Sequence, residues 1–206
     1  MIIDERLVTY INSLDTGNTE ILDTIEKEAL DTYVPIIRKE MQGFLKLLLA
    51  MKRPARILEV GTAVGFSAIL MAEYDPVECE ITTIENYEKR IPIARENFKR
   101  AGKEHQITLL EGDATEILKE LTKPYDFIFM DAAKGQYIHF MPDILRLLKP
   151  EGLLVSDNVL QDGDIIESHF IVTRRNRTIH KRMREYLYAL THSEELVTSI
   201  LPIGDG

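Results

Sequence analysis

Short apolar runs alternate with longer amphipathic segments along most of the chain. The runs cover 56–60, 80–85, 106–110, 125–130 and 152–156, and a sixth is expected over 195–203. Between them, apolar residues recur at helical spacing, as Ile91, Ala94 and Phe98 do. Strands separated by helix-length segments imply right-handed βαβ units. We therefore predict an α/β fold with a mostly parallel sheet and helices on both faces.

The first fifty residues lack such runs and predict helices instead. Pro35 is expected at a first helical position, ahead of the apolar segment 41–52. With 206 residues and a hydrophobic fraction of 45%, one domain with a sizeable core is the simplest organisation. We expect a single domain over 1–206, made of an N-terminal helical cap over 1–53 and a Rossmann-like core over 54–206.

Composition narrows the class of protein. No stretch approaches the roughly 18 apolar residues of a membrane-spanning helix, and acidic residues occupy the start where a signal peptide would be basic. We expect a cytoplasmic protein that does not bind membranes. The single cysteine, Cys79, excludes an internal disulfide. The formal net charge of −9 argues against general nucleic-acid binding but allows a local basic patch.

The end of the first predicted strand carries a glycine turn. Gly61 and Gly65 in "ILEVGTAVGFS" would let backbone amides approach a ligand closely. The spacing differs from the dinucleotide pattern G-x-G-x-x-G, and Glu59 would repel a pyrophosphate. A cofactor that carries an ammonium group fits better, so the residues favour a methyl donor over a dinucleotide.

Two further strand ends carry acids that suit a nucleoside. Glu85 follows Gly65 by 20 residues, where nucleoside-binding α/β folds place the acceptor of the ribose hydroxyls. Taken alone, it could equally be a solvated strand-end acid. Asp113 in "EGDATEIL" can cap the next helix, accept from an adenine amino group, or do both.

The fourth and fifth strand ends predict a metal site. Asp131 closes one strand, and Asp157 and Asn158 close the next. Adjacent strand ends would bring two carboxylates and an amide oxygen into one crevice, a donor set that suits Mg²⁺ or another divalent cation. Three protein ligands leave positions open for substrate, so we predict a catalytic site. Asp131 alone could instead be a helix N-cap.

Taken together, "ILEVGTAVGFS", "TTIEN", "EGDA", "FMDAAKGQY", "LLKPEG" and "VSDNV" resemble the metal-dependent O-methyltransferases of the catechol and caffeoyl-CoA type. The resemblance covers the chain from about Pro35. It implies a seven-stranded class I methyltransferase sheet, S-adenosylmethionine as donor, Mg²⁺ and a homodimer. The chain ends at "PIGDG", where relatives continue into a final antiparallel strand, which leaves that sheet edge open.

Carried over by residue, the resemblance assigns each side chain a role. Asp131, Asp157 and Asn158 would bind the metal. From its position one helical turn after Asp131, Lys134 can act as general base, or it could be a solvated surface lysine or a phosphate contact. The donor would contact Glu85 through its ribose and Asp113 and the Ala114 amide through its adenine. Its methionine end would meet Gly61, Ser67 and the Ile37 backbone, with Glu59 lining the same pocket.

The acceptor is expected to be RNA. Six basic residues and no acid lie between Arg174 and Arg184, and we expect Arg174, Arg175, Arg177 and Lys181 to grip phosphates. The chain most resembles the bacterial members that methylate 5-hydroxyuridine at the wobble position of tRNA, giving 5-methoxyuridine. The basic segment could instead be an ordinary solvated helix face, with a catechol or caffeoyl-CoA-like molecule as acceptor. Two further alternatives for the whole protein are a non-catalytic S-adenosylmethionine-binding protein and an NAD-linked oxidoreductase.

Overall fold

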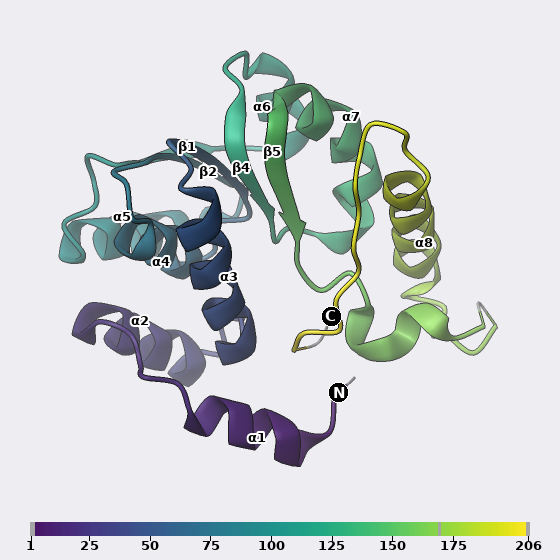
Figure 1. The fold of residues 1–206 in the computed structure, drawn as a ribbon, viewed down its shortest axis with the longest axis horizontal. Coiled ribbons are helices and arrows are strands. Elements are labelled where there is room, and N and C mark those ends of the chain that lie inside the picture. The colour runs from purple at the N-terminus through teal and green to yellow at the C-terminus, as the bar shows by residue number, and fades with distance from the viewer. Residues whose placement is uncertain (1–2, 169, 205–206) are drawn as a thin grey trace.

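The computed structural model describes residues 3–168 and 170–204. Within them lies one sheet of five parallel strands, in the order β3-β2-β1-β4-β5 (Figure 1). The strands are β1 (Arg56–Val60), β2 (Glu80–Glu85), β3 (Ile107–Glu111), β4 (Tyr125–Met130) and β5 (Leu148–Ser156). The strand order reverses between β1 and β4. In an open parallel sheet, such a switch point opens a crevice at the carboxyl ends of the strands.

Helices cover both faces of the sheet, as predicted (Figure 1). Cap helices α1 (Glu5–Ser13), α2 (Glu20–Asp31) and α3 (Lys39–Lys52) precede β1, and α4 (Phe66–Tyr74), α5 (Ile91–Arg100), α6 (Ala114–Glu120), α7 (Tyr137–Leu147) and α8 (Arg177–Thr191) follow. Two 3₁₀ segments, η1 (Lys134–Gln136) and η2 (Gln161–Ile166), join the later elements. No helix in the described residues is long and apolar enough to cross a membrane.

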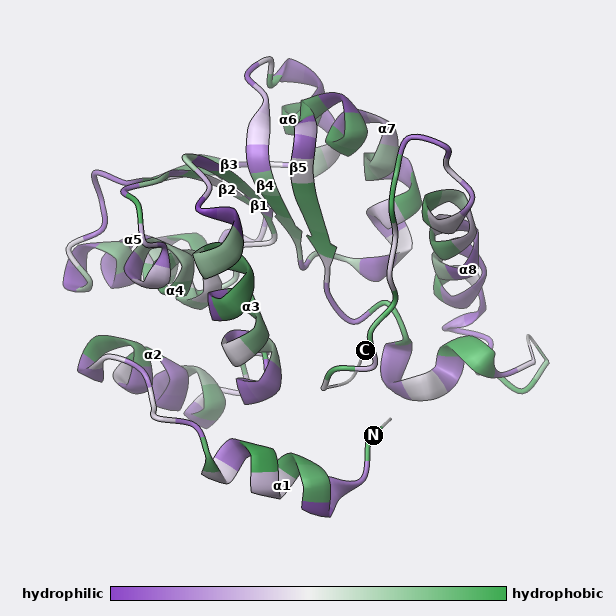
Figure 2. Cartoon of the chain, in the orientation of Figure 1, coloured by the Kyte–Doolittle hydropathy of each residue, from purple (hydrophilic) through white to green (hydrophobic). Residues whose placement is uncertain are grey.

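The core is split into two apolar clusters by the sheet itself. Side chains alternate along β4, so Phe127 and Phe129 pack with α2 to α5, whereas Ile128 and Met130 pack with α6 to α8. All four are fully buried. Each such side chain contributes roughly 1.5–3 kcal/mol of hydrophobic free energy. Figure 2 shows this apolar interior in the sheet and the mixed character of the covering helices.

The expected strand over 195–203 is wrong. Residues 194–203 hold no regular strand or helix, although the chain runs extended beside α8 (Figure 1). Val197 is fully exposed, and Thr198 is tied only through its hydroxyl, which donates to Leu190 O at 2.9 Å. The resemblance implied seven strands, but the described residues form only five. An apolar pattern makes a strand only where a neighbouring edge completes its hydrogen bonds.

Pro35 does not begin a helix. The helix expected there starts four residues later, at Lys39, and 34–38 forms an irregular connection between α2 and α3. Tyr33, just before it, has a left-handed backbone with φ of 56°. The connection turns its side chains toward the carboxyl ends of the strands, where the cavity described below is found.

Gly61 fixes the spacing between the two central strand ends. A Cβ at Gly61 would lie 2.1 Å from Asp131 O, and its φ of 106° disfavours any side chain. We expect Gly61→Ala to lower the free energy of unfolding by at least ~3 kcal/mol, because backbone atoms must move apart. Gly102→Ala is the matched control. Gly102 has φ of 65° but open space around it, so about 1 kcal/mol should be lost. Equal losses in urea denaturation would contradict this account.

Candidate active site

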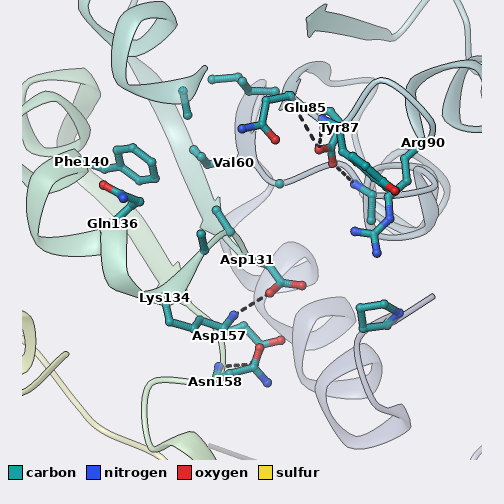
Figure 3. Close-up of a pocket in the computed structure, with 18 of the residues that line it drawn as sticks. Val60, Glu85, Tyr87, Arg90, Asp131, Lys134, Gln136, Phe140, Asp157 and Asn158 are labelled. Carbon is teal, nitrogen blue, oxygen red and sulfur yellow. Dashed lines mark hydrogen bonds and ion pairs between the residues drawn. The ribbon is translucent and has the colours of Figure 1, made fainter. Parts of the chain in front are cut away.

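A cavity of about 610 Å³ lies at the carboxyl ends of the strands (Figure 3). This volume falls in the range of roughly 300–1,000 Å³ that is typical of small-molecule sites. The predicted residues that line it are Ile37, Gly61, Glu85, Asp113, Ala114, Asp131, Lys134, Asp157 and Asn158. Ser67 lines a smaller adjoining hollow, which shares Ile37, Gly61 and Asp131 with the main cavity. The topology therefore brings together most of the residues that the sequence singled out.

Glu85 is held rigidly at one end of the cavity. Its Oε2 accepts from the Ala63 amide at 2.7 Å, and its Oε1 accepts from the amides of Asn86 and Tyr87 at 3.0 and 2.9 Å. Figure 3 shows these bonds beside Tyr87 and Arg90. Three backbone donors orient the carboxylate, while its remaining lone pairs can accept from ligand hydroxyls.

Glu59 lies beneath the cavity and does not line it, so that expectation is wrong. The side chain is 0% exposed and accepts from the hydroxyls of Ser67 and Thr83. Burial raises the pKa of Glu59 to about 7, although both hydroxyl bonds oppose the shift. Thr62 Oγ1 lies 2.6 Å from Thr83 Oγ1 and extends the network under the glycine turn. Glu59 thus stabilises the floor of the pocket from below.

Lys134 is bound to Asp131. Its Nζ donates to Asp131 Oδ1 at 2.8 Å and lies 3.1 Å from the hydroxyl of Tyr137 (Figure 3 labels the ion pair). Tyr137 is fully buried, which raises the pKa of its hydroxyl well above the usual value and keeps it neutral. That hydroxyl also donates to Met130 O at 2.9 Å, and Asp157 O lies 3.2 Å away. Tyr137 therefore joins the ends of β4 and β5 to the lysine.

Asp157 and Asn158 reach the same end of the cavity from the end of β5. Asp157 is 7% exposed, and its Oδ1 accepts from the backbone N–H of Asn158 at 2.9 Å. Asn158 has a left-handed backbone with φ of 55°. Asn158 and the carboxylates of Asp131 and Asp157 lie close together in Figure 3. No three His, Cys, Asp or Glu side chains cluster as a metal site in the described residues. The predicted metal site contains only two such side chains, Asp131 and Asp157, because its third member, Asn158, is an amide.

Asp113 caps α6, one of the two roles expected of it. Its Oδ1 accepts from the Thr115 amide at 2.7 Å, and this bond holds the pKa of Asp113 below its usual value. Asp113 and Ala114 both line the cavity at the end that holds Glu85.

The basic stripe lies on α8 and in the turn before it, outside the residues that line the cavity. Arg174, Arg175 and Lys181 are exposed, and none of the four predicted phosphate contacts lines the cavity. Arg177 instead donates to Val172 O at 3.2 Å and to Phe170 O at 3.3 Å, so it holds the loop before α8. The physical reason is local: the helix begins at Arg177, which turns this guanidinium back onto its own chain.

Several lining residues were not identified from the sequence. They are Arg38, Asn86, Tyr87, Arg90, Gln136 and Phe140, and Tyr137 lies just behind them. Tyr137 had a usable signal, because it follows Lys134 by three residues and can meet it across one helical turn. The others have no such signal, since only the tertiary fold brings their loops and helices to the cavity. Arg182, also missed, donates to Gly135 O at 3.1 Å and thereby steadies the segment that carries Lys134.

A strand-switch crevice with a glycine turn, a ribose-type acid and an oxygen-rich far end defines a nucleoside-cofactor enzyme of the Rossmann-like class. Comparison with known proteins makes this specific. The O-methyltransferase family model matches residues 12–206. A catechol O-methyltransferase of Niastella koreensis is 37% identical over 173 residues, which are 81% of this chain and 78% of that protein.

Two solved structures agree. A Staphylococcus aureus protein described as a candidate caffeoyl-CoA O-methyltransferase superposes with a TM-score of 0.89 at 32% identity, covering 98% of this chain and 96% of that one. A Podospora anserina methyltransferase bound to S-adenosylhomocysteine gives 0.86 at 27% identity, with coverage of 98% and 91%. The chain belongs to the O-methyltransferase family and is a methyltransferase enzyme.

The buried Glu59 predicts a pH-dependent stability. Because its folded pKa of about 7 exceeds the value of 4.5 that is usual for a glutamate, the protonated carboxyl stabilises the fold fully below pH ~4.5. That contribution is lost as pH rises to about 7. At about 1.4 kcal/mol per unit, wild type should lose about 3 kcal/mol over this window. Glu59→Gln should show a flatter curve in urea denaturation between pH 5 and 8. Parallel curves for the two proteins would rule out this protonation.

Proposed function

We propose that this enzyme transfers the methyl group of S-adenosylmethionine to one hydroxyl of a small aromatic acceptor with two adjacent oxygens, as in a catechol. One observation carries the proposal. A single cavity holds a rigid ribose-type acceptor, Glu85, at one end and the oxygens of Asp131, Asp157 and Asn158 at the other. The similarity to a catechol O-methyltransferase supports the proposed acceptor, and the similarity to a methyltransferase that binds S-adenosylhomocysteine supports the proposed donor.

The donor would lie along the glycine turn. Glu85 would accept from the ribose hydroxyls, and Asp113 with the Ala114 amide would meet the adenine. The methionine end would reach Ser67, Gly61 and the Ile37 backbone through the smaller hollow. Glu59 would contribute from below by fixing the Ser67 hydroxyl rather than by touching the donor.

The far end suits a divalent cation by the chemistry of its donors. Asp131 and Asp157 supply hard carboxylate oxygens and Asn158 an amide oxygen, the ligands that Mg²⁺ prefers. A bound cation would supply fixed positive charge that orients an acceptor hydroxyl and makes it more acidic. Asp131 would hold that charge on one side while its ion pair with Lys134 fixes the carboxylate in place.

Lys134 is the proposed general base. Its Nζ is positioned by Asp131 and Tyr137, which restrict it to the oxygen-rich end of the cavity. Only the neutral amine can accept a proton, so Lys134 would first release one to solvent, as a cation bound to Asp131 replaces the ammonium as partner of that carboxylate. The acceptor hydroxyl would then pass its proton to Nζ as its oxygen attacks the methyl group, and S-adenosylhomocysteine would leave as the neutral thioether. Arg182 supports the same segment through Gly135 O. Each of these groups comes from a different element, so the arrangement depends on the whole fold.

The acceptor is proposed to be a small molecule rather than tRNA. The relatives reported above are named for catechol or caffeoyl-CoA, and the arginine stripe does not border the cavity. The tRNA substrate stays a prediction without support. The homodimer and the cytoplasmic location also stay predictions. The exposed side chains of Leu7 and Tyr10 in α1, and of Leu14 directly after it, are compatible with a second copy, and light scattering would decide this.

Metal dependence gives the first test of this function. Methyl transfer to a catechol should stop in EDTA and return with excess Mg²⁺. Asp157→Asn keeps the acceptor for the Asn158 amide but removes a charge, so activity should fall at least ~100-fold. Binding of S-adenosylhomocysteine, measured by calorimetry, should stay within about twofold because this side chain faces the acceptor end. Full activity in EDTA would exclude the metal.

The acceptor is tested by a matched panel. Labelled S-adenosylmethionine should methylate simple catechols and leave monophenols of the same size unmodified, because only adjacent oxygens can chelate. A tRNA bearing 5-hydroxyuridine should react with far lower kcat/KM. Replacing Arg174 and Arg175 by alanine should leave catechol turnover unchanged. Efficient tRNA methylation that falls in this double variant would restore the RNA substrate and reject the small-molecule one.

A further inference from the structure

A buried amide joins the N-terminal cap to the wall of the cavity. Gln42, in α3, is 1% exposed. Its Nε2 donates to Glu26 Oε1 of α2 at 3.0 Å and to Ile37 O at 3.0 Å. Its Oε1 accepts from Asn18 Nδ2 at 2.8 Å. Both N–H donors and the carbonyl of this side chain are therefore used, as a buried amide requires.

The orientation of this amide is determined by its neighbours. The carboxylate of Glu26 can only accept, so it must face the NH₂ group of Gln42. Asn18 donates from the other side and so faces the oxygen. Lys39 Nζ lies 2.6 Å from Glu26 Oε2, which keeps that carboxylate in place. One N–H of Gln42 is thereby directed at the carbonyl of Ile37.

Ile37 belongs to a wall that has no regular structure of its own. Residues 34–38 are irregular, and Pro35, Ile36 and Ile37 line both the main cavity and the smaller hollow. A segment without a helix or strand ladder relies on side-chain bonds to hold its backbone. The bond from Gln42 supplies such a restraint directly at Ile37, next to the proposed site of the methionine end.

We propose that Gln42 is a positioning residue for the donor pocket: it holds the 35–38 wall in its binding conformation, and Glu26 of α2 directs its amide. This inference rests on the proposed use of S-adenosylmethionine. It gives the cap a role in binding as well as in folding. A hydrophobic residue at position 42 would leave Ile37 O without this donor and would leave the Glu26 carboxylate with one partner fewer.

The first variant removes the amide. Gln42→Met keeps the length of the side chain and loses all three hydrogen bonds. S-adenosylhomocysteine should bind about tenfold more weakly by calorimetry, the consequence of one lost restraint of ordinary strength. KM for S-adenosylmethionine should rise similarly, with kcat at saturation nearly unchanged. Failure of the wild type to bind S-adenosylhomocysteine would reject the proposed function itself, not this role.

The second variant separates positioning from mere packing. Glu26→Gln removes the ion pair with Lys39 but keeps an acceptor for Gln42 Nε2, so the bond to Ile37 O stays. We expect Tm to fall while the affinity for S-adenosylhomocysteine stays within about twofold of wild type. Asp126→Asn is the control, because Asp126 binds Lys149 and the Arg56 amide at the opposite end of the sheet. It should lower Tm without changing affinity.

The result that overturns the proposal is equally clear. If affinity follows Tm across these variants, or if Gln42→Met binds S-adenosylhomocysteine as tightly as wild type, Gln42 only stabilises the fold. Where Gln42→Met does not fold, Gln42→Asn takes its place, since it keeps a buried amide on a side chain one carbon shorter and so withdraws the donor from Ile37 O.

Discussion

The site depends on how closely two central strands approach each other just beyond their ends. Gly61 follows β1 and Asp131 follows β4, and no side chain at Gly61 could fit against the Asp131 carbonyl. The hydrogen-bond ladder continues past the strands, because the Asp131 amide donates to Val60 O at 3.0 Å and the Asp157 amide to Met130 O at 2.9 Å. The donor turn and the oxygen-rich end thus share one rigid edge. Their separation is set by backbone packing, which cannot adjust as a loop would.

Sequence patterns predicted the features that depend on local chemistry or on the general rule for parallel sheets. The strands 56–60, 80–85 and 125–130 match the structure because each is a short run rich in apolar and β-branched residues, which is typical of a strand buried in a parallel sheet. The acids at the strand ends meet because carboxyl ends share an edge. The run over 195–203 looked similar but lacks a partner strand in the described residues, and a pairing partner is not encoded in the run itself.

What the sequence could not predict depends on contacts between distant segments. Gln42 reads as one more polar residue in an apolar helix, and only the fold brings Glu26 and Ile37 to its amide. The orientation of the basic segment depends on distant contacts for a related reason. Its charge is a local property, but the direction in which it faces is tertiary, and Arg177 turns back to carbonyls of its own loop. The number of charges therefore predicted that a basic surface exists, but not which part of the protein it lies beside.

The left-handed backbone at Asn158 limits how this site can diverge. Asparagine, aspartate and glycine adopt φ near 55° readily, whereas β-branched residues do so only under strain. An exchange for aspartate would add a negative charge with little conformational penalty, while valine or threonine would disturb the turn after β5. Natural variation at this position should therefore alter the charge of the oxygen set more readily than its shape. In the proposed metal site, such an exchange would change which cation is preferred without rebuilding the strand ends.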